Sequence, residues 1–299
     1  MEYHRSVMLS ECLEALQIHP EKIYIDATLG GGGHTLAIAK QLTTGLIFAF
    51  DQDIDAIKNF SGHPNVVAVT ANFSDIATEL TKRNIFSVSG ILADLGVSSH
   101  QIDIPERGFS FRYDGPLDMR MNKNQPKSAA SILNEYSESA IEKMLNQYGD
   151  VSNSQKIARL IFNYKQFKPF QTTQDLVAAL EPLTPKFHSY QFLAPIFQAI
   201  RIETNEEMKH LILFLEQAAK LLETNGKLVV LTYHSIEDRI VKHFMKSKNY
   251  SDDNADQVFG GSKGNVFEVL TKKAMPPSES EIAVNPRSRS AKLRAARKR

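Results

Sequence analysis

Four short apolar runs in the first hundred residues alternate with segments whose apolar residues follow a helical spacing. The runs are bounded by glycine, asparagine or aspartate, and they cover residues 22–27, 45–50, 66–70 and 90–95. Apolar strands separated by helices are typical of βαβ units around a parallel sheet that is buried on both faces. The sequence therefore predicts a doubly wound α/β fold.

The segments between the runs predict helices over about residues 35–41, 53–60 and 74–83, with Asp53 and Ser74 as N-caps. The alternation resumes with a helix over about 205–222, a strand over 226–232, a helix over 235–246 and a strand over 266–271. Between Gln101 and Ile202 it stops, and helical patterns over about 128–134, 138–148, 154–164 and 173–180 take its place. The length of 299 residues also favours two domains. We expect one α/β domain formed by residues 1–103 and 203–299, and an inserted helical domain over 104–202.

A glycine run joins the first predicted strand to the first predicted helix, in the order Asp26-Ala-Thr-Leu-Gly30-Gly31-Gly32-Gly33-His34. Consecutive glycines allow close approach of a ligand to the backbone, but they are costly to order. A strand-to-helix turn of a doubly wound sheet is also where backbone amides face a ligand. We therefore interpret the run as a binding loop rather than a flexible turn.

The run lacks the G-x-G-x-x-G spacing of dinucleotide-binding loops, which argues against a dinucleotide. Asp51 ends the second predicted strand, where a carboxylate can accept both hydroxyls of a ribose. Together these features predict an adenosine-type ligand. Asp53 is better placed to cap the next helix than to bind a metal, and no metal site is expected. Phe73 follows the third strand, where it suits either contact with an adenine or packing in the core.

The fourth predicted strand ends in Asp94, at the sheet edge where doubly wound proteins carry out their chemistry. A loop over residues 105–121 follows, and it mixes aromatic, arginine and glycine residues. Such a loop suits stacking on a base and contact with phosphate, and it equally suits a loop folded over a neighbouring core.

Charge is concentrated at the C-terminus, although the whole chain carries a formal net charge of only +1. The last thirteen residues contain seven basic side chains and no acid, namely Arg287, Arg289, Lys292, Arg294, Arg297, Lys298 and Arg299. This pattern fits either a contact with a polyanion such as RNA or a solvated tail. No apolar run is long enough to span a membrane and no signal peptide is evident, so a cytoplasmic protein is expected. The single cysteine, Cys12, lies in an apolar helical pattern and is interpreted as core packing.

The sequence resembles the bacterial ribosomal RNA small subunit methyltransferase H family, also called MraW, over nearly the entire chain. The motifs that carry the resemblance are Tyr3-His4, Asp26-Ala-Thr-Leu-Gly30, Gly32-Gly33-His34, Asp51-Gln-Asp53, Asn72-Phe-Ser74, Asp94-Leu-Gly-Val-Ser-Ser99, Arg107-Gly-Phe-Ser-Phe111, Gly115-Pro-Leu-Asp-Met-Arg-Met121, Phe197-Gln-Ala199, His234-Ser-Ile-Glu-Asp-Arg239 and Asn285-Pro-Arg-Ser-Arg-Ser290. The chain departs from the usual family pattern at Ser6, Gly31, Tyr233 and residues 191–196.

The resemblance implies a class I methyltransferase fold in which the inserted domain recognises the substrate. It implies S-adenosylmethionine as cofactor, held by Gly32, Gly33, His34, Asp51, Phe73, Asp94 and Gln101. It further implies that the protein methylates N4 of a cytidine in the decoding region of 16S rRNA, with the rRNA or the small ribosomal subunit as partner. The sequence does not fix the oligomeric state, and a homodimer stays open.

Base-modifying enzymes need their target unstacked, and we expect the cytidine to be held near Asp94, Phe109 and His234. No catalytic residue is assigned, because Asp94 could serve the cofactor alone and His234 could be a hydrogen-bonded histidine at the sheet edge. Two alternatives stay open. One is methylation of another acceptor, such as a DNA amine or a protein, and the other is an RNA-binding protein that senses the cofactor without catalysis.

Overall fold

The computed structural model describes residues 6–246 and 266–299. The chain divides into two compact units, of which unit 1 comprises Met1–Gly96 with Lys209–Arg299 and unit 2 comprises Val97–Met208. Unit 2 is thus one continuous stretch of chain, whereas unit 1 is assembled from both ends. The Tyr3-His4 motif lies outside the described residues.

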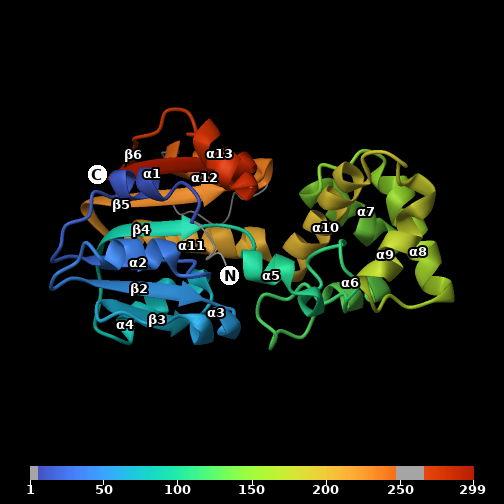
Figure 1. Ribbon diagram of the computed structural model, residues 1–299, viewed down its shortest axis with the longest axis horizontal. Coiled ribbons are helices and arrows are strands. Elements are labelled where there is room, and N and C mark those ends of the chain that lie inside the picture. The colour runs from blue at the N-terminus through green and yellow to red at the C-terminus, as the bar shows by residue number, and fades with distance from the viewer. Residues whose placement is uncertain (1–5, 247–265) are drawn as a thin grey trace. The chain divides into compact units, whose positions relative to one another are not determined.

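Unit 1 is built on a seven-stranded sheet with the order β3-β2-β1-β4-β5-β7-β6 (Figure 1). The strands are β1 (Ile23–Asp26), β2 (Leu46–Asp51), β3 (Val66–Thr70), β4 (Val88–Asp94), β5 (Leu222–Thr232), β6 (Phe267–Val269) and β7 (Lys292–Lys298). The first five are parallel, whereas β7 runs antiparallel to both β5 and β6. This arrangement confirms the predicted α/β fold and each strand named from the apolar runs.

The helices of unit 1 pack on both faces of this sheet. They are α1 (Leu9–Leu16), α2 (Gly33–Ala39), α3 (Ile54–Asn59), α4 (Ile76–Thr81), α11 (Glu207–Leu221), α12 (Ser235–Lys246) and α13 (Glu279–Val284), with 3-10 turns η1 (Phe73–Asp75) and η4 (Pro286–Ser290). One apolar core joins the sheet to α4, α11 and α12, and the other joins it to α1 and α2. Cys12 is fully buried in the second core, as its spacing predicted.

The N-cap predictions have different outcomes. Asp53 caps α3, because its carboxylate accepts a hydrogen bond from the Asp55 N–H at 3.1 Å. The prediction for Ser74 is wrong: Asn72 caps the turn η1 by accepting from the Ser74 N–H, and α4 begins only at Ile76. The sequence pattern predicted that the helix starts at Ser74, but a 3-10 turn occupies that position and the helix follows it.

The interpretation of the basic C-terminus as a solvated tail is wrong, because residues 292–298 form β7 inside the sheet. Leu293, Ala295 and Ala296 are buried there. Arg294 is 6% exposed and makes a bidentate ion pair with Asp238 of α12, at 2.7 and 3.0 Å. The Asp238 carboxylate of α12, far away in the sequence, accounts for a buried arginine in a strand that a local charge pattern marks as exposed.

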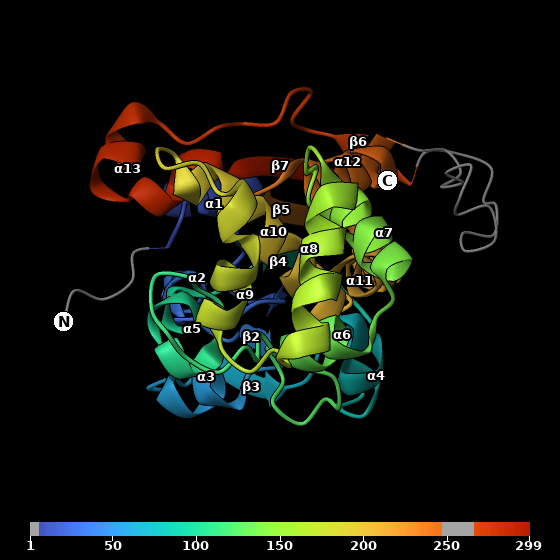
Figure 2. The same ribbon diagram turned by 90° about the vertical axis from the view of Figure 1, so that its right-hand side faces the viewer.

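Unit 2 is helical, with helices α5 (Ser99–Asp103), α6 (Ala129–Glu135), α7 (Glu138–Tyr148), α8 (Ser154–Phe167), α9 (Thr173–Leu180) and α10 (Ser189–Thr204) and 3-10 turns η2 (Pro105–Arg107) and η3 (Glu181–Leu183). Its own apolar core gathers residues of α6 to α10, and α7 and α8 lie side by side (Figure 2). The sequence did not predict α10, which carries Pro195 in its interior. A proline inside a helix removes one backbone donor, and the buried Leu193, Ile196 and Phe197 hold the helix in place around it.

Within residues 6–246 and 266–299, no helix combines the length and the apolar character that crossing a membrane requires.

Candidate active site

Three aspartates end three neighbouring strands of unit 1. Asp26 ends β1, Asp51 ends β2 and Asp94 ends β4, and these strands are parallel and hydrogen-bonded in the order β2-β1-β4. The carboxyl ends of parallel strands meet at one edge of the sheet, and ligands of open α/β sheets bind there. The structure therefore brings together the strand-end acids that the sequence marked, and the glycine loop lies at the same edge between β1 and α2.

The glycine loop adopts a conformation that needs glycine at two positions. Gly30 and Gly32 have φ angles of 49° and 77°, in the left-handed region. A Cβ at Gly32 would lie 2.7 Å from the Phe60 ring, and one at Gly33 would collide with Ser6 Oγ. Gly32 is thus fixed by both backbone and space, and Gly33 by space alone. The φ of Gly31 is not in the left-handed region, and that residue is exposed.

Asp51 ties this loop to the end of β2. Its Oδ2 accepts from the Gly30 N–H at 2.9 Å, and its Oδ1 accepts from the Asp53 N–H at 2.8 Å. Each carboxylate oxygen has a second lone pair, so these bonds leave the carboxylate able to accept from a ligand hydroxyl as well. Asp51 thus lies against the glycine loop, and its contact with a ribose stays a prediction.

Asp26 is fully buried beneath the loop and organises it. Its carboxylate accepts from Thr35 Oγ1 at 2.6 Å and from the Thr28 N–H at 3.1 Å. Thr28 Oγ1 in turn accepts from the Asp94 N–H at 2.7 Å, which links β1 to β4. Burial raises the pKa of Asp26 to about 6, against the lowering effects of His34 and of its hydrogen bonds. This acid supports the loop and does not face solvent.

His34 lies between Asp26 and Asp94 and is 6% exposed. Burial lowers the pKa of its imidazole, and the nearby Asp26 opposes that effect. Nε2 lies 3.0 Å from the Val7 carbonyl oxygen, which can only accept, so Nε2 carries the proton of the neutral ring. The unprotonated Nδ1 then lies 3.7 Å from Asp94 Oδ2. Two acceptors side by side suit a ligand that brings a positively charged N–H donor.

Asp94 has a second fixed neighbour that the sequence analysis noted only as a departure from a family pattern. The hydroxyl of Tyr233, at the end of β5, donates to Asp94 Oδ1 at 2.6 Å. Burial, followed by the charge of Asp94, raises the pKa of this phenol, so it stays protonated and remains a donor. Tyr233 therefore fixes one oxygen of this carboxylate, and His34 Nδ1 lies near the other.

We expect Tyr233→Phe to weaken cofactor binding by about 10-fold, the scale of one hydrogen bond to a charged group. The ring packing is retained, so the melting temperature of the ligand-free protein should change little. Titration calorimetry with S-adenosylmethionine measures the effect. Tyr24→Phe is the matched control, because the Tyr24 hydroxyl oxygen accepts from the His19 N–H at 2.7 Å, away from the three aspartates. Equal affinities for the wild type and Tyr233→Phe would contradict the orienting role.

The remaining predicted site residues lie in different surroundings. Phe73 is half-buried in turn η1 and packs edge-on against Phe214, with ring centroids 5.3 Å apart, so it belongs partly to the core. His234 follows Tyr233, and its Nε2 lies 3.0 Å from Glu237 Oε1 with the side chain 9% exposed. Its Nδ1 accepts from the Glu237 N–H at 3.4 Å, which fits a hydrogen-bonded histidine at the sheet edge.

Gln101 and Phe109 belong to unit 2. Gln101 is buried in α5, where its side chain accepts from the Ser98 N–H at 3.1 Å and completes a capping box. Phe109 packs against the core of unit 2, with the Arg107 guanidinium 5.8 Å from its ring centroid. Their roles toward cofactor and cytidine remain predictions.

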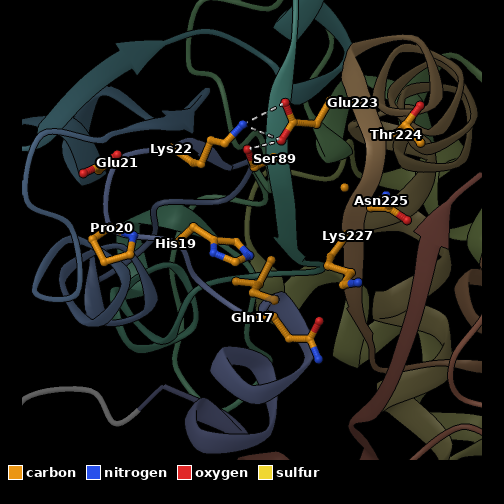
Figure 3. Close-up of a pocket in the computed structure, with 12 residues that line it drawn as sticks. Gln17, His19, Pro20, Glu21, Lys22, Ser89, Glu223, Thr224, Asn225 and Lys227 are labelled. Atoms are coloured by element: carbon orange, nitrogen blue, oxygen red, sulfur yellow. Dashed lines mark hydrogen bonds and ion pairs between the residues drawn. The ribbon is translucent and has the colours of Figure 1, made fainter.

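A cavity of about 540 Å³ occupies the other edge of the sheet in unit 1, near the amino ends of β1 and β5 (Figure 3). Lys22 Nζ and Ser89 Oγ both contact the Glu223 carboxylate at its rim, at 3.3 and 2.6 Å. None of the predicted site residues lines this cavity. Its charges are in part satisfied internally, and we assign it no function.

The hydrogen-bond acceptors at the carboxyl edge of the sheet fit S-adenosylmethionine, which carries an ammonium group, a sulfonium, a ribose with two hydroxyls and an adenine. Asp51 offers a carboxylate for the ribose, and the pair of His34 Nδ1 and Asp94 offers acceptors for a cationic amine. Gly32 allows the backbone to approach closely. The described residues contain no group of three or more histidine, cysteine or acidic side chains placed to hold a metal ion.

The chain was compared with known proteins. The MraW methylase family matches residues 1–299. A ribosomal RNA small subunit methyltransferase H from Cytophaga hutchinsonii is 43% identical over 98% of this chain and 99% of its own length, and one from Amoebophilus asiaticus is 44% identical over 98% and 94%. Among solved structures, an rRNA methylase from Streptococcus thermophilus covers 100% of this chain and 99% of its own, with a TM-score of 0.43 and 12% identity.

The family match confirms the resemblance read from the motifs, and with it the class I methyltransferase fold and S-adenosylmethionine as cofactor. The family match and the identities over the full length together show that this chain belongs to the MraW methylase family.

Proposed function

We propose that the protein transfers a methyl group from S-adenosylmethionine to N4 of a cytidine in the decoding region of 16S rRNA. The observation that carries the proposal is the similarity, over the whole chain, to relatives named ribosomal RNA small subunit methyltransferase H. The three strand-end aspartates and the glycine loop of unit 1 supply the cofactor side of this reaction.

The cofactor contacts in this proposal are Gly32, Gly33, His34, Asp51, Phe73, Asp94 and Gln101. When bound, S-adenosylmethionine supplies a methyl group that its sulfonium already activates. The protein then needs no nucleophilic side chain, and its task is to hold the acceptor amine in line with that methyl group. Positioning of this kind can contribute about 7–11 kcal/mol to lowering the barrier.

On the cofactor side, the hydrogen bonds around Asp94 position its carboxylate to accept from S-adenosylmethionine. Asp94 is held by Tyr233 on Oδ1 and by Thr28 on its backbone N–H, and His34 Nδ1 lies 3.7 Å from Oδ2. A preorganised acceptor of this kind pays no reorganisation cost at the moment of reaction. Asp51 is fixed in the same way by two backbone N–H groups.

For the RNA side, we propose that unit 2 is the recognition domain. It is a separately packed helical unit inserted in the chain between β4 and α11, and it contains the aromatic and arginine-rich loop. Phe109 from this loop and His234 from unit 1 are the proposed cytidine contacts, and the catalytic residue stays unassigned.

The test is methyl transfer from radiolabelled S-adenosylmethionine to small ribosomal subunits, naked 16S rRNA, DNA and protein in parallel. Label in the subunit or the rRNA, recovered as N4-methylcytidine after nuclease digestion, is the expected result. Label in DNA or protein alone would replace the proposed acceptor. Cofactor binding without transfer to any acceptor would favour the cofactor-sensing RNA-binding protein.

A further inference from the structure

The loop over residues 105–121 contains three arginines, and two of them serve the loop itself. Arg107 is 3% exposed, and its Nη2 donates to the backbone carbonyl oxygens of Arg120 and Met121. Arg120 makes a bidentate pair with Asp118, at 2.7 and 2.8 Å. Both guanidiniums therefore hold the loop's own conformation. Arg112, in contrast, is exposed.

Arg112 lies over an aromatic ring that sequence reasoning did not single out. Its guanidinium carbon is 5.4 Å from the centroid of the Tyr190 ring, in the first turn of α10. Tyr190 is 55% exposed, so a large part of the ring surface faces solvent beside a positive charge. Arginine stacked on an aromatic ring is a common partner for nucleobases.

The Tyr190 ring is anchored rather than free to swing. Phe111 packs against it at 5.4 Å between centroids, and Phe111 in turn packs edge-on against the buried Phe197 of α10 at 5.1 Å. Tyr113, two residues after Phe111, is held as well, because Thr173 Oγ1 donates to its carbonyl oxygen. A ring fixed in this way presents a stacking surface at little cost in side-chain entropy.

Further exposed residues lie just before Tyr190 in the chain. Phe187 is 82% exposed, and Lys186 and His188 beside it are exposed too. We call Arg112, Phe187 and Tyr190 the aromatic platform. Exposed large aromatic side chains mark an interaction surface more often than scattered small apolar ones do.

We propose that the aromatic platform binds a single-stranded segment of the RNA substrate, with bases stacked on Tyr190 and Phe187 and a phosphate held by Arg112. This inference rests on the proposed function and adds a place and a mode of RNA contact to it. Duplex RNA keeps its bases stacked inside, and it would leave the rings without partners. An apolar protein surface would bury the Arg112 charge without an acceptor. A single strand satisfies both the rings and the charge.

The experiment measures binding of a labelled single-stranded oligoribonucleotide, and of the same sequence as a duplex, by fluorescence anisotropy over a range of salt concentrations. We expect Tyr190→Ala to weaken single-strand binding by roughly 5- to 150-fold, with its salt dependence unchanged. Tyr190→Phe keeps the ring and should bind nearly as the wild type does. Arg112→Ala should weaken binding and also reduce the slope of log affinity against log salt by about 0.7, the value for one phosphate contact.

The matched control is Phe86→Ala, which removes a 68% exposed aromatic side chain from unit 1. It should leave RNA affinity unchanged. Cofactor affinity and melting temperature of the Tyr190 and Arg112 variants should equal those of the wild type, which excludes a folding defect as the cause.

The outcomes separate this inference from the proposed function. Wild-type-like RNA binding by Tyr190→Ala, or equal affinity of the wild type for single strand and duplex, overturns the platform whether or not methyl transfer occurs. The platform is also overturned if Tyr190→Ala weakens binding of a protein partner but leaves RNA binding unchanged. Loss of RNA binding in Tyr190→Ala, together with no methyl transfer by the wild type to any rRNA substrate, would retain the platform and remove the proposed reaction.

Discussion

Deletion of residues 292–299 is expected to leave unit 1 unfolded, and not merely to weaken RNA binding as loss of a basic RNA-contacting tail would. The deletion removes β7 from between β5 and β6, exposes the edge of β5, and leaves the Asp238 carboxylate without its bidentate arginine. Loss of one partner of a buried pair costs about 3–5 kcal/mol, and this mostly buried pair should cost up to that amount. Whole domains are stable by only about 5–15 kcal/mol, so the added loss of Leu293 and the strand pairing should exceed what remains.

Soluble yield, far-UV circular dichroism and melting temperature measure the effect. Two controls separate the effect of losing strand β7 from the effect of losing a positive charge. Deletion of Arg299 alone should leave the fold intact, and so should Arg289→Ala, which removes an exposed charge outside β7. A truncated protein with a wild-type melting temperature would show that β7 is dispensable and would return the C-terminus to the role of a simple basic tail.

Substitution of Asp51 by alanine is expected to weaken S-adenosylmethionine binding by about 100-fold or more, with a parallel loss of methyl transfer. The carboxylate fixes the glycine loop through the Gly30 N–H, and in the proposed site it also accepts from the ribose. Each hydrogen bond to a charged group is worth about 1.5–3 kcal/mol, and the variant removes both the ligand contact and the restraint on the loop.

Titration calorimetry with S-adenosylmethionine and with its demethylated product gives the two affinities. Both should fall equally, because Asp51 is assigned to the ribose and not to the transferred methyl group. Asp55→Ala is the control. It removes a carboxylate from the first turn of α3 and keeps the hydrogen bond that the residue 55 N–H donates to the Asp53 carboxylate. An Asp51→Ala protein with unchanged affinity for both ligands would remove this residue from the site.

Much of unit 1 follows from local sequence. Strands β1, β2 and β4 are buried on both faces, so they are continuous apolar runs that stand out from their surroundings. The acids at their carboxyl ends could be placed at one edge because parallel strands share their direction. The glycine loop could be assigned because its residue types restrict the backbone. Both features depend on a few neighbouring residues.

The features that local sequence did not predict depend on distant partners. Arg294 fits inside a sheet only because Asp238 of α12 meets it, and Tyr233 gains a role only because β5 lies beside β4. Tyr190 is distinctive because Arg112, far earlier in the chain, lies over it. Helix α10 contains a proline that argues against a helix, and only the core of unit 2 explains its stability. A pattern within one segment carries no information on such pairs.

The placement of β7 has a consequence for the order in which the protein can be made. Unit 2 is one uninterrupted stretch, so its core is complete once residue 208 has left the ribosome. The sheet of unit 1 needs residues 292–298, and β5 has an open edge until they emerge. Synthesis therefore yields the helical unit first and completes the sheet that carries the glycine loop only once β7 has emerged. A chain that stops before β7 has an intact unit 2 and an incomplete unit 1.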